Sequence, residues 1–355
     1  MSQPPTDPPS IRTIGALTAA AKANLSDGAW AYGSAGAGEE VTVARNRQAW
    51  RHLGFVPSVL RDVRDVDVST RFLGLDLALP VLCSPVGSLT VFHPDGALAA
   101  ARGAEGAGTV AMTGTLSSPA FPEVQAGSGG NNLFQIYVSG DEVWLDRLVE
   151  RVTEAGASGL CVTIDSPVSA RRDRLLDGAF DWRTEREGVP PNLEGLGRQR
   201  EFQKHFTLED FARLRTSTEL PLLVKGIMTA ADARRVVDAG ADVVYVSNHG
   251  GRELDHNRSS IEALPDVIAE IGDDAEVILD SGVRHGSDIA KAIALGARAV
   301  LIGRLQCWGL AVGGADGVRL VLDILRDELE TTLALIGVTS LDELTPDHVC
   351  ETLPV

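Results

Sequence analysis

Eight short apolar segments recur between residues 80 and 303, each followed by a stretch rich in Ala and Leu with helical periodicity. The segments are apolar throughout rather than alternating, so both faces of the strands that they form must be buried. They are Pro80–Ser84, Thr109–Thr113, Leu133–Val138, Gly159–Asp165, Pro221–Lys225, Asp242–Ser247, Glu276–Asp280 and Ala299–Gly303. Strands that alternate with helices imply parallel β-α-β units, and eight such units predict an α/β protein with a closed (β/α)8 TIM barrel.

The remaining segments predict one barrel domain with additions at its two ends. Residues 1–10 are Pro-rich and resemble neither a strand nor a secretory signal, so we expect a disordered tail there and a single domain over residues 11–355. Helices before the first strand should cap the barrel, one of them around Val41–Ala49. Asp316–Ile336 has the pattern of an amphipathic helix that closes the fold.

Composition excludes several classes of partner. The chain carries 32 basic and 49 acidic side chains, a net charge of −17, which argues against nucleic acid or an anionic membrane as its main partner. A transmembrane helix needs about 18 or more consecutive apolar residues, and the sequence has no such segment. The four cysteines form no CxxC pair and no Cys/His cluster, so we expect no metal site and a reduced, cytoplasmic protein.

One connection between predicted strands is much longer than the others. Residues 175–220 join the fourth and fifth strands and are largely polar. Long connections inside compact domains are often functional, and this one should leave the carboxyl-terminal rim of the barrel, where active sites lie. We therefore predict an active-site loop, with a plain flexible insert as the alternative.

Ionisable residues and glycines follow nearly every predicted strand. Asp280–Arg284 and Gly303–Arg304 end neighbouring strands, and this combination of glycine and arginine is typical of a phosphate site; structural arginines paired with local carboxylates are the alternative. His249 and Arg252 flank two glycines, which predicts a base and a carboxylate clamp in one cavity. Asp165 could orient that imidazole.

Lys225 ends the fifth predicted strand after an apolar approach. Its ammonium should be partly desolvated, which suits either stabilisation of a developing anion or Schiff-base chemistry.

Several motifs in order resemble those of the FMN-dependent α-hydroxy acid oxidase and dehydrogenase family, which includes glycolate oxidase, lactate oxidase and mandelate dehydrogenase. The strongest is Ser247–Asp255, which reads SNHGGRELD. The similarity runs from about Ile14 to the C-terminus. Further matching segments are Tyr32 to Asn46, His93–Gly96, Phe134–Val138, Thr163–Asp165, Leu223–Gly226 and Gly282–Arg284.

The resemblance implies a role for each matching residue. His249 resembles the base, Asp165 its partner, and Lys225 the lysine beside the flavin N1–C2 edge. Substrate would be bound by Tyr32, Tyr137, Arg172 and Arg252. FMN would be held by Pro85, Val86, Gly87, Gly114, Gln135, Thr163, Lys225, Ser247, Asp280, Ser281, Gly282, Arg284, Gly303 and Arg304.

The sequence departs from the family pattern at a few positions. Gly114 stands where many members have Ser, Ser281 interrupts a usual Gly-Gly pair, and Leu305 replaces a common Pro. Position 87 is Gly where many oxidases of small substrates have Ala, and position 116 is Leu where glycolate oxidases have Trp. The last two changes should widen the space over the flavin, so we expect an L-2-hydroxy acid larger than glycolate.

Other functions stay open at this point. One alternative is a specialised biosynthetic flavin oxidase acting on an amino-acid-derived or peptide-derived substrate, which the residues at positions 114 and 281 favour. Another is an FMN-dependent isopentenyl diphosphate isomerase, although such an enzyme has no need of the base and clamp. A flavin protein without catalysis would not need the intact set His249, Asp165, Lys225 and Arg252.

The resemblance also implies a homo-oligomer, a tetramer or an octamer. It leaves the electron acceptor open between oxygen and another oxidant.

Overall fold

The structure is a computed structural model that describes residues 11–178, 180, 189–196 and 202–353. Its largest sheet has eight parallel strands in the order β4-β11-β10-β9-β8-β7-β6-β5. The strands are β4 Val81–Cys83, β5 Met112–Gly114, β6 Leu133–Ile136, β7 Leu160–Thr163, β8 Leu222–Ile227, β9 Val243–Val246, β10 Glu276–Leu279 and β11 Ala299–Ile302. A parallel bridge between Cys83 and Ala111 joins the two ends of the sheet, so the sheet closes and the predicted barrel is confirmed.

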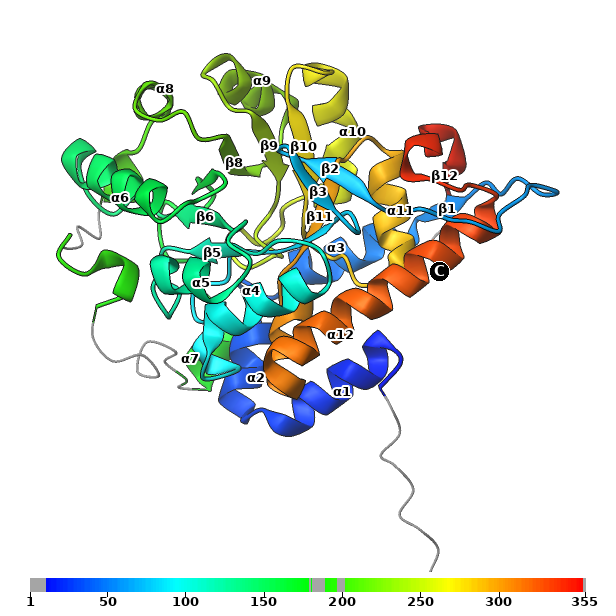
Figure 1. Cartoon of the computed structure of the whole chain (residues 1–355), viewed down its shortest axis with the longest axis horizontal. Coiled ribbons are helices and arrows are strands. Elements are labelled where there is room, and N and C mark those ends of the chain that lie inside the picture. Colours follow the sequence, from blue (N-terminus) through cyan, green and yellow to red (C-terminus); the bar gives the residue numbers. More distant parts are fainter. Residues whose placement is uncertain (1–10, 179, 181–188, 197–201, 354–355) are drawn as a thin grey trace, which may run out of the picture.

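Helices surround the sheet, as Figure 1 shows. The α-helices after the first strand of the barrel are α4 Gly96–Gly106, α5 Phe121–Gly127, α6 Glu142–Glu154, α7 Asp173–Asp177, α8 Leu208–Thr216, α9 Ala230–Asp238, α10 Ser260–Ile271, α11 Gly286–Ala294 and α12 Arg304–Ile336. Short 3-10 helices are η1 Leu89–Val91, η2 Pro191–Leu193, η3 Phe202–His205, η4 Leu341–Glu343 and η5 Pro346–His348. None of the described helices is long and apolar enough to cross a membrane.

The interior of the barrel is filled by alternate residues of its strands. Leu82, Met112, Cys161, Leu223 and Ile278 belong to one buried cluster, while their neighbours in the same strands pack outward against the helices. The hairpin of β2 Thr70–Phe72 and β3 Leu75–Leu77 contributes to the same inner cluster. The hairpin also bonds to the first residue of β10, so it closes the amino-terminal end of the barrel. Only the opposite end is left for a site.

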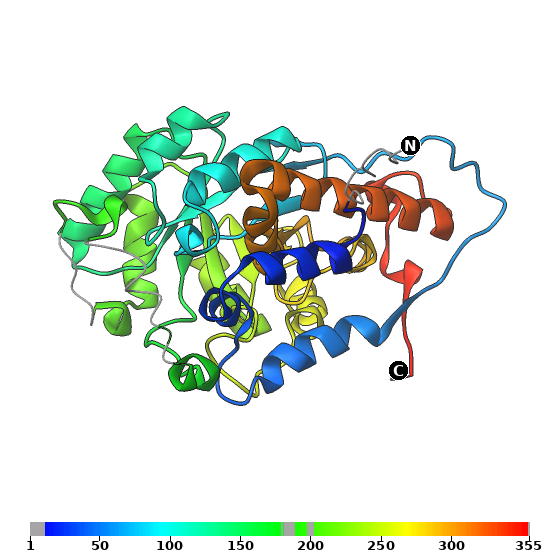
Figure 2. The ribbon, with the colours of Figure 1, turned by 90° about the horizontal axis from the view of Figure 1, so that it is seen from below.

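The segment before the barrel forms α1 Ile14–Asn24, α2 Asp27–Ser34, α3 Val41–Arg51 and β1 Leu53–Phe55. The predicted helix around residues 41–49 is therefore present. β1 pairs antiparallel with β12 Val349–Glu351, which ties the two ends of the described chain together. Figure 2 shows the segment after α3 extending outward at one end of the molecule, beside the C-terminal residues.

The predicted C-terminal helix is present, but α12 begins twelve residues earlier and is broken inside. Gly313 and Gly314 have non-helical backbone angles, so the helix changes direction there. The two parts then pack so closely that a Cβ atom at Gly317 would overlap the carbonyl oxygen of Gly309. Only glycine fits a backbone-to-backbone contact of this kind.

The connection between β7 and β8 differs from the expected long loop. Residues 208–216 form α8, which begins with a capping box between Thr207 and Asp210. The buried side chains of α8 are only Phe211 and Leu214, so its apolar stripe is too narrow to stand out from the polar sequence. Residues 179, 181–188 and 197–201 of this connection, and the predicted tail 1–10, lie outside the described residues.

Gly317→Ala should lower the free energy of unfolding by about 1–3 kcal/mol, because the added methyl group must push the Gly309 backbone away. Chemical denaturation of the two proteins measures the difference. The matched control is Gly15→Ala in α1, where the nearest atom to an added Cβ is 4.0 Å away and helix propensity favours Ala. Equal stability of wild type and Gly317→Ala would contradict the close packing described here.

Candidate active site

A cavity of about 1500 Å3 opens at the carboxyl-terminal end of the barrel. Residues that follow the strands line its floor, and α2 contributes one wall through Trp30 and Tyr32. The connection after β7 contributes another wall through Leu175, Phe180 and Gln203. The described part of that connection therefore lies where an active-site loop was predicted.

The turn after β9 presents His249 to this cavity. His249, Gly250 and Gly251 have consecutive positive φ angles of 58°, 65° and 74°. Left-handed backbone is costly for residues with a Cβ atom, so the two glycines make the turn possible. The Ser281 hydroxyl braces the turn, because its Oγ accepts hydrogen bonds from the backbone N–H groups of Asn248 (3.3 Å) and Gly250 (3.0 Å).

The His249 ring has different neighbours on its two nitrogens. Nδ1 lies 3.0 Å from Oδ1 of Asp165 and 3.2 Å from Nζ of Lys225. Nε2 lies 3.3 Å from the Tyr137 hydroxyl, on the cavity side. A carboxylate beside Nδ1 favours the tautomer with the proton on that nitrogen. The lone pair of Nε2 is then directed toward Tyr137 and the cavity, where it can accept a proton.

Asp165 and Lys225 form an ion pair, with 3.6 Å between Oδ2 and Nζ. Burial alone would raise the pKa of Asp165, but the Lys225 ammonium and His249 outweigh it and lower the pKa to about 2. Burial likewise opposes the charge on Lys225, and the carboxylates of Asp165 and Asp280 outweigh that effect, so its pKa is raised. Both groups therefore stay charged at neutral pH.

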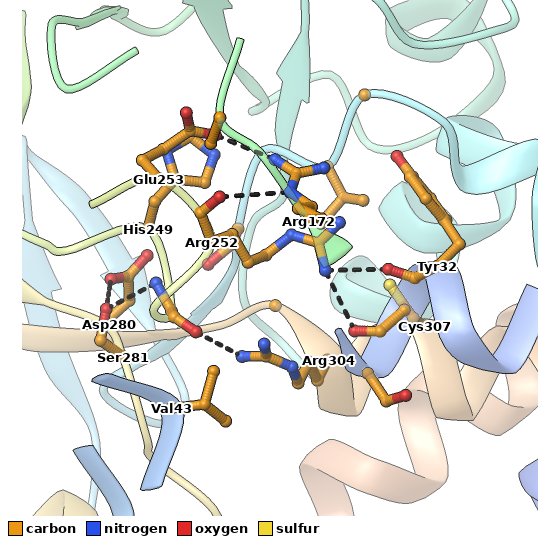
Figure 3. Close-up of a pocket in the computed structure, with 18 of the residues that line it drawn as sticks. Tyr32, Val43, Arg172, His249, Arg252, Glu253, Asp280, Ser281, Arg304 and Cys307 are labelled. Atoms are coloured by element: carbon orange, nitrogen blue, oxygen red, sulfur yellow. Dashed lines mark hydrogen bonds and ion pairs between the residues drawn. The ribbon is translucent and has the colours of Figure 1, made fainter. Parts of the chain in front are cut away.

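Arg252 is a partly buried cation held by backbone oxygens. Its Nη1 donates to the carbonyls of Tyr32 (2.8 Å) and Ala35 (2.7 Å), as Figure 3 shows. Burial, together with the nearby guanidinium groups of Arg172 and Arg304, lowers its pKa to about 9. Within the described ranges Arg252 makes no ion pair with a carboxylate, so its charge is available to an anionic ligand.

Arg304 and Arg284 form a second cationic region, at the ends of β11 and β10. Arg304 donates to the carbonyls of Gly250 (2.9 Å) and Ala35 (3.2 Å), but its buried Nε finds no hydrogen-bond partner among the described residues. Burial and then the charge of Arg284 lower the pKa of Arg304 to about 10. Neither arginine is paired with a carboxylate in the part of the chain that is described, which favours an anion site over the structural alternative.

Most of the predicted site residues line the cavity. They are Tyr32, Pro85, Val86, Gly87, Tyr137, Arg172, Lys225, His249, Arg252, Asp280, Ser281, Gly282, Arg284, Gly303 and Arg304. The other predicted residues lie behind this lining and support it. Gln135 donates to the Thr163 hydroxyl at 2.8 Å, Gly114 leaves room for the Gln135 side chain, and Ser247 Oγ accepts from the His249 N–H at 3.1 Å.

One wall of the cavity is aromatic, which the sequence did not predict. Trp30 and Trp308 stack with ring centroids 4.5 Å apart, and Tyr32 lies 6.0 Å from Phe92 and 6.4 Å from Phe180. Apart from Trp30 and Tyr32, which share α2, these residues come from separate parts of the chain, and only Tyr32 was predicted as a site residue. No local pattern could have found the wall. Glu253, directly after Arg252, was also missed; it pairs with Arg172.

Comparison with protein families matches residues 21–351 to the model of the FMN-dependent dehydrogenase family. Among curated relatives, the peroxisomal (S)-2-hydroxyacid oxidase of Arabidopsis thaliana is 39% identical over 330 residues, covering 88% of this chain and 89% of the relative. The L-lactate oxidase of Nostoc sp. is 39% identical over 349 residues, covering 91% of this chain and 94% of that protein.

Solved structures agree with these relatives. A soluble mutant of the membrane-associated (S)-mandelate dehydrogenase from Pseudomonas putida superposes with a TM-score of 0.92 at 33% identity, covering 97% of this chain and 100% of that chain. A mandelate oxidase structure matches with a TM-score of 0.87 at 36% identity, covering 98% and 100%.

Asp165→Asn should make the free energy of unfolding less dependent on pH in acid. The folded-state pKa of Asp165 is lowered, so its stabilising effect is present above pH ~4 and is lost as the pH falls toward 2. That loss amounts to about 2 kcal/mol in wild type. Urea unfolding at pH 5 and pH 2.5 should show a smaller decrease for Asp165→Asn than for wild type.

The control for this experiment is Asp76→Asn, whose side chain is 94% exposed, and its acid decrease should match that of wild type. An unchanged decrease in Asp165→Asn would show that the Asp165 charge contributes nothing to stability.

Proposed function

Because the chain belongs to the FMN-dependent dehydrogenase family, we propose that it oxidises an (S)-2-hydroxy acid larger than glycolate, with His249 as the base. FMN-dependent oxidation of 2-hydroxy acids is the activity of its relatives. One observation supports the proposal most strongly: an imidazole backed by a carboxylate lies in the same cavity as a partly buried arginine, Arg252, which pairs with no carboxylate of the described residues.

The residues of the cavity fit FMN. Arg284 and Arg304 would hold its phosphate, and the buried Arg304 Nε without a partner fits such a ligand. Lys225 would lie at the flavin edge, where a buried ammonium stabilises negative charge. Pro85 to Gly87 would lie against the ring, with Gln135 and Thr163 supporting them from behind. The chemistry that FMN supplies when bound is the acceptance of the two electrons that leave the substrate.

His249 would remove a proton from the substrate at Nε2. The Asp165 carboxylate at Nδ1 holds the ring in the required tautomer and stabilises the imidazolium that forms. The Tyr137 hydroxyl lies beside the same Nε2, where it can donate a hydrogen bond to the substrate. Arg252 would bind the substrate carboxylate and place the hydroxyl-bearing carbon against the base.

Substrate size follows from the wall of the cavity. Gly87 and Leu116 both line it, as do the aromatic rings of Trp30, Phe92 and Trp308. An apolar wall of this kind favours a substrate with an aromatic or branched side chain over glycolate.

Anaerobic mixing with a panel of 2-hydroxy acids tests the proposed function. Bleaching of the flavin absorbance identifies the substrate, and the rate at which the yellow colour returns in air separates an oxidase from a dehydrogenase. The cysteine usage favours a cytoplasmic protein, while the resemblance implies a homo-oligomer and leaves the electron acceptor open. A holoenzyme that no 2-hydroxy acid bleaches would overturn the proposal.

His249→Gln should slow flavin reduction by about 10²–10⁴-fold or more, because a placed base contributes that much to proton removal. Stopped-flow absorbance under anaerobic conditions measures the rate. The FMN content of the variant should equal that of wild type. Reduction at a near-normal rate would exclude His249 as the base.

Gly87→Ala tests substrate size. The added methyl group would occupy space in the wall of the cavity, and its Cβ would lie 3.1 Å from Leu116 Cβ, so Leu116 would have to shift slightly. We expect wild type to prefer L-mandelate to L-lactate and glycolate, and Gly87→Ala to lower the mandelate-to-lactate ratio of kcat/KM by about tenfold. Steady-state kinetics with the three acids measure this. The idea fails if glycolate is the best wild-type substrate or if the ratio does not change.

A further inference from the structure

Glu253 places a carboxylate in the wall of the cavity, directly after the clamp residue Arg252. Its Oε1 accepts from Nη2 of Arg172 at 2.9 Å, and Nε of Arg172 donates to the Arg252 carbonyl at 3.2 Å. The side chains of Arg172 and Glu253 are only 18% and 11% exposed. Figure 3 shows this pair beside His249 and Arg252. Arg172 is therefore fixed by protein groups on two sides.

This pairing divides the cationic groups of the site into two kinds. Arg172 is neutralised by Glu253, and Lys225 is paired with Asp165. Asp280, another carboxylate of the site, is hydrogen-bonded elsewhere, because its Oδ2 accepts a hydrogen bond from the Tyr245 hydroxyl at 2.8 Å. Arg252 donates to backbone carbonyls and lies over the Tyr32 ring, so among the cations around His249 it is the one whose charge is not already balanced by a carboxylate of the described chain.

We propose that Glu253 is a specificity-determining residue: by pairing with Arg172 it leaves one cationic position for one substrate carboxylate and excludes a second anionic group. This inference rests on the proposed function and specifies its substrate class as monocarboxylates. A dicarboxylate would bring its second charge toward Glu253, whose side chain is mostly shielded from solvent, so the charge repulsion would be only weakly screened. With Glu253 neutral, Arg172 would be free to bind that second carboxylate in a bidentate manner.

The experiment compares two unreactive ligands of equal chain length, succinate and butyrate, which differ in one carboxylate. Each is titrated into the FMN-loaded enzyme, and the change in flavin absorbance gives the Kd. Wild type should bind butyrate more tightly than succinate. In Glu253→Gln, which keeps the size of the side chain and removes its charge, succinate affinity relative to butyrate should rise at least about tenfold.

A double-mutant cycle with Arg172→Met tests whether Glu253 acts through Arg172. In that background Glu253→Gln should raise the relative succinate affinity much less, because the freed guanidinium is absent. Arg172→Met alone should lower the succinate affinity relative to butyrate further, because it leaves Glu253 unpaired. If Glu253→Gln does not fold, Arg172→Met still tests the proposal. The matched control is Glu142→Gln, which removes a surface partner of Arg213 and should leave the ratio unchanged.

Three results would overturn the inference. The first is an unchanged ratio in Glu253→Gln, and the second is the same gain with and without Arg172. The third is weaker binding of both ligands to Glu253→Gln, which would mean that Glu253 serves to orient Arg172 toward substrate. Failure of the proposed function would look different, because wild-type flavin would then be bleached by no 2-hydroxy acid.

Discussion

Closure of the parallel sheet is the constraint on which the rest of the molecule depends. An open parallel sheet leaves unpaired N–H and C=O groups at two edges, and here the two edge strands meet at the Cys83–Ala111 bridge. Closure brings the carboxyl ends of all eight strands into one ring. Residues as far apart in sequence as Pro85 and Arg304 therefore line one cavity. The β2-β3 hairpin packs into the other end, and the cavity opens at the carboxyl-terminal end.

The charged side chains of this cavity are stabilised in two different ways. Asp165 and Lys225 neutralise each other next to His249, so each remains ionised although buried. Arg252 and Arg304 donate to backbone carbonyls instead, which satisfies some of their N–H groups without cancelling their charge. Cationic positions prepared in this way attract anions strongly. The arrangement fits a site that must hold two anions, a phosphate and a carboxylate.

The strands and the His249 turn could be predicted because their signals are local. Continuous apolar segments marked the strands, although β5 begins at Met112, three residues after the start of the predicted segment. Two consecutive glycines marked the turn, and the structure shows why both are needed. The helix α8 was missed because its apolar stripe is narrow. The Arg172–Glu253 pair and the aromatic wall join residues distant in sequence, and the contacts of Arg252 involve backbone oxygens that have no sequence signature.

The pairing of β1 with β12 has a consequence for the order of folding. Leu53 to Phe55 find their partner only at residues 349–351, almost three hundred residues later. During synthesis this pairing must wait until nearly the whole chain has left the ribosome. The helix α1 likewise cannot reach its final position until α12 has been synthesised, because the two helices pack against each other. The helix α2, which forms one wall of the cavity, lies in sequence between α1 and β1, the two elements that make these late contacts. The amino-terminal segment, which carries one wall of the ligand pocket, can therefore dock completely only after the last part of the chain has been made.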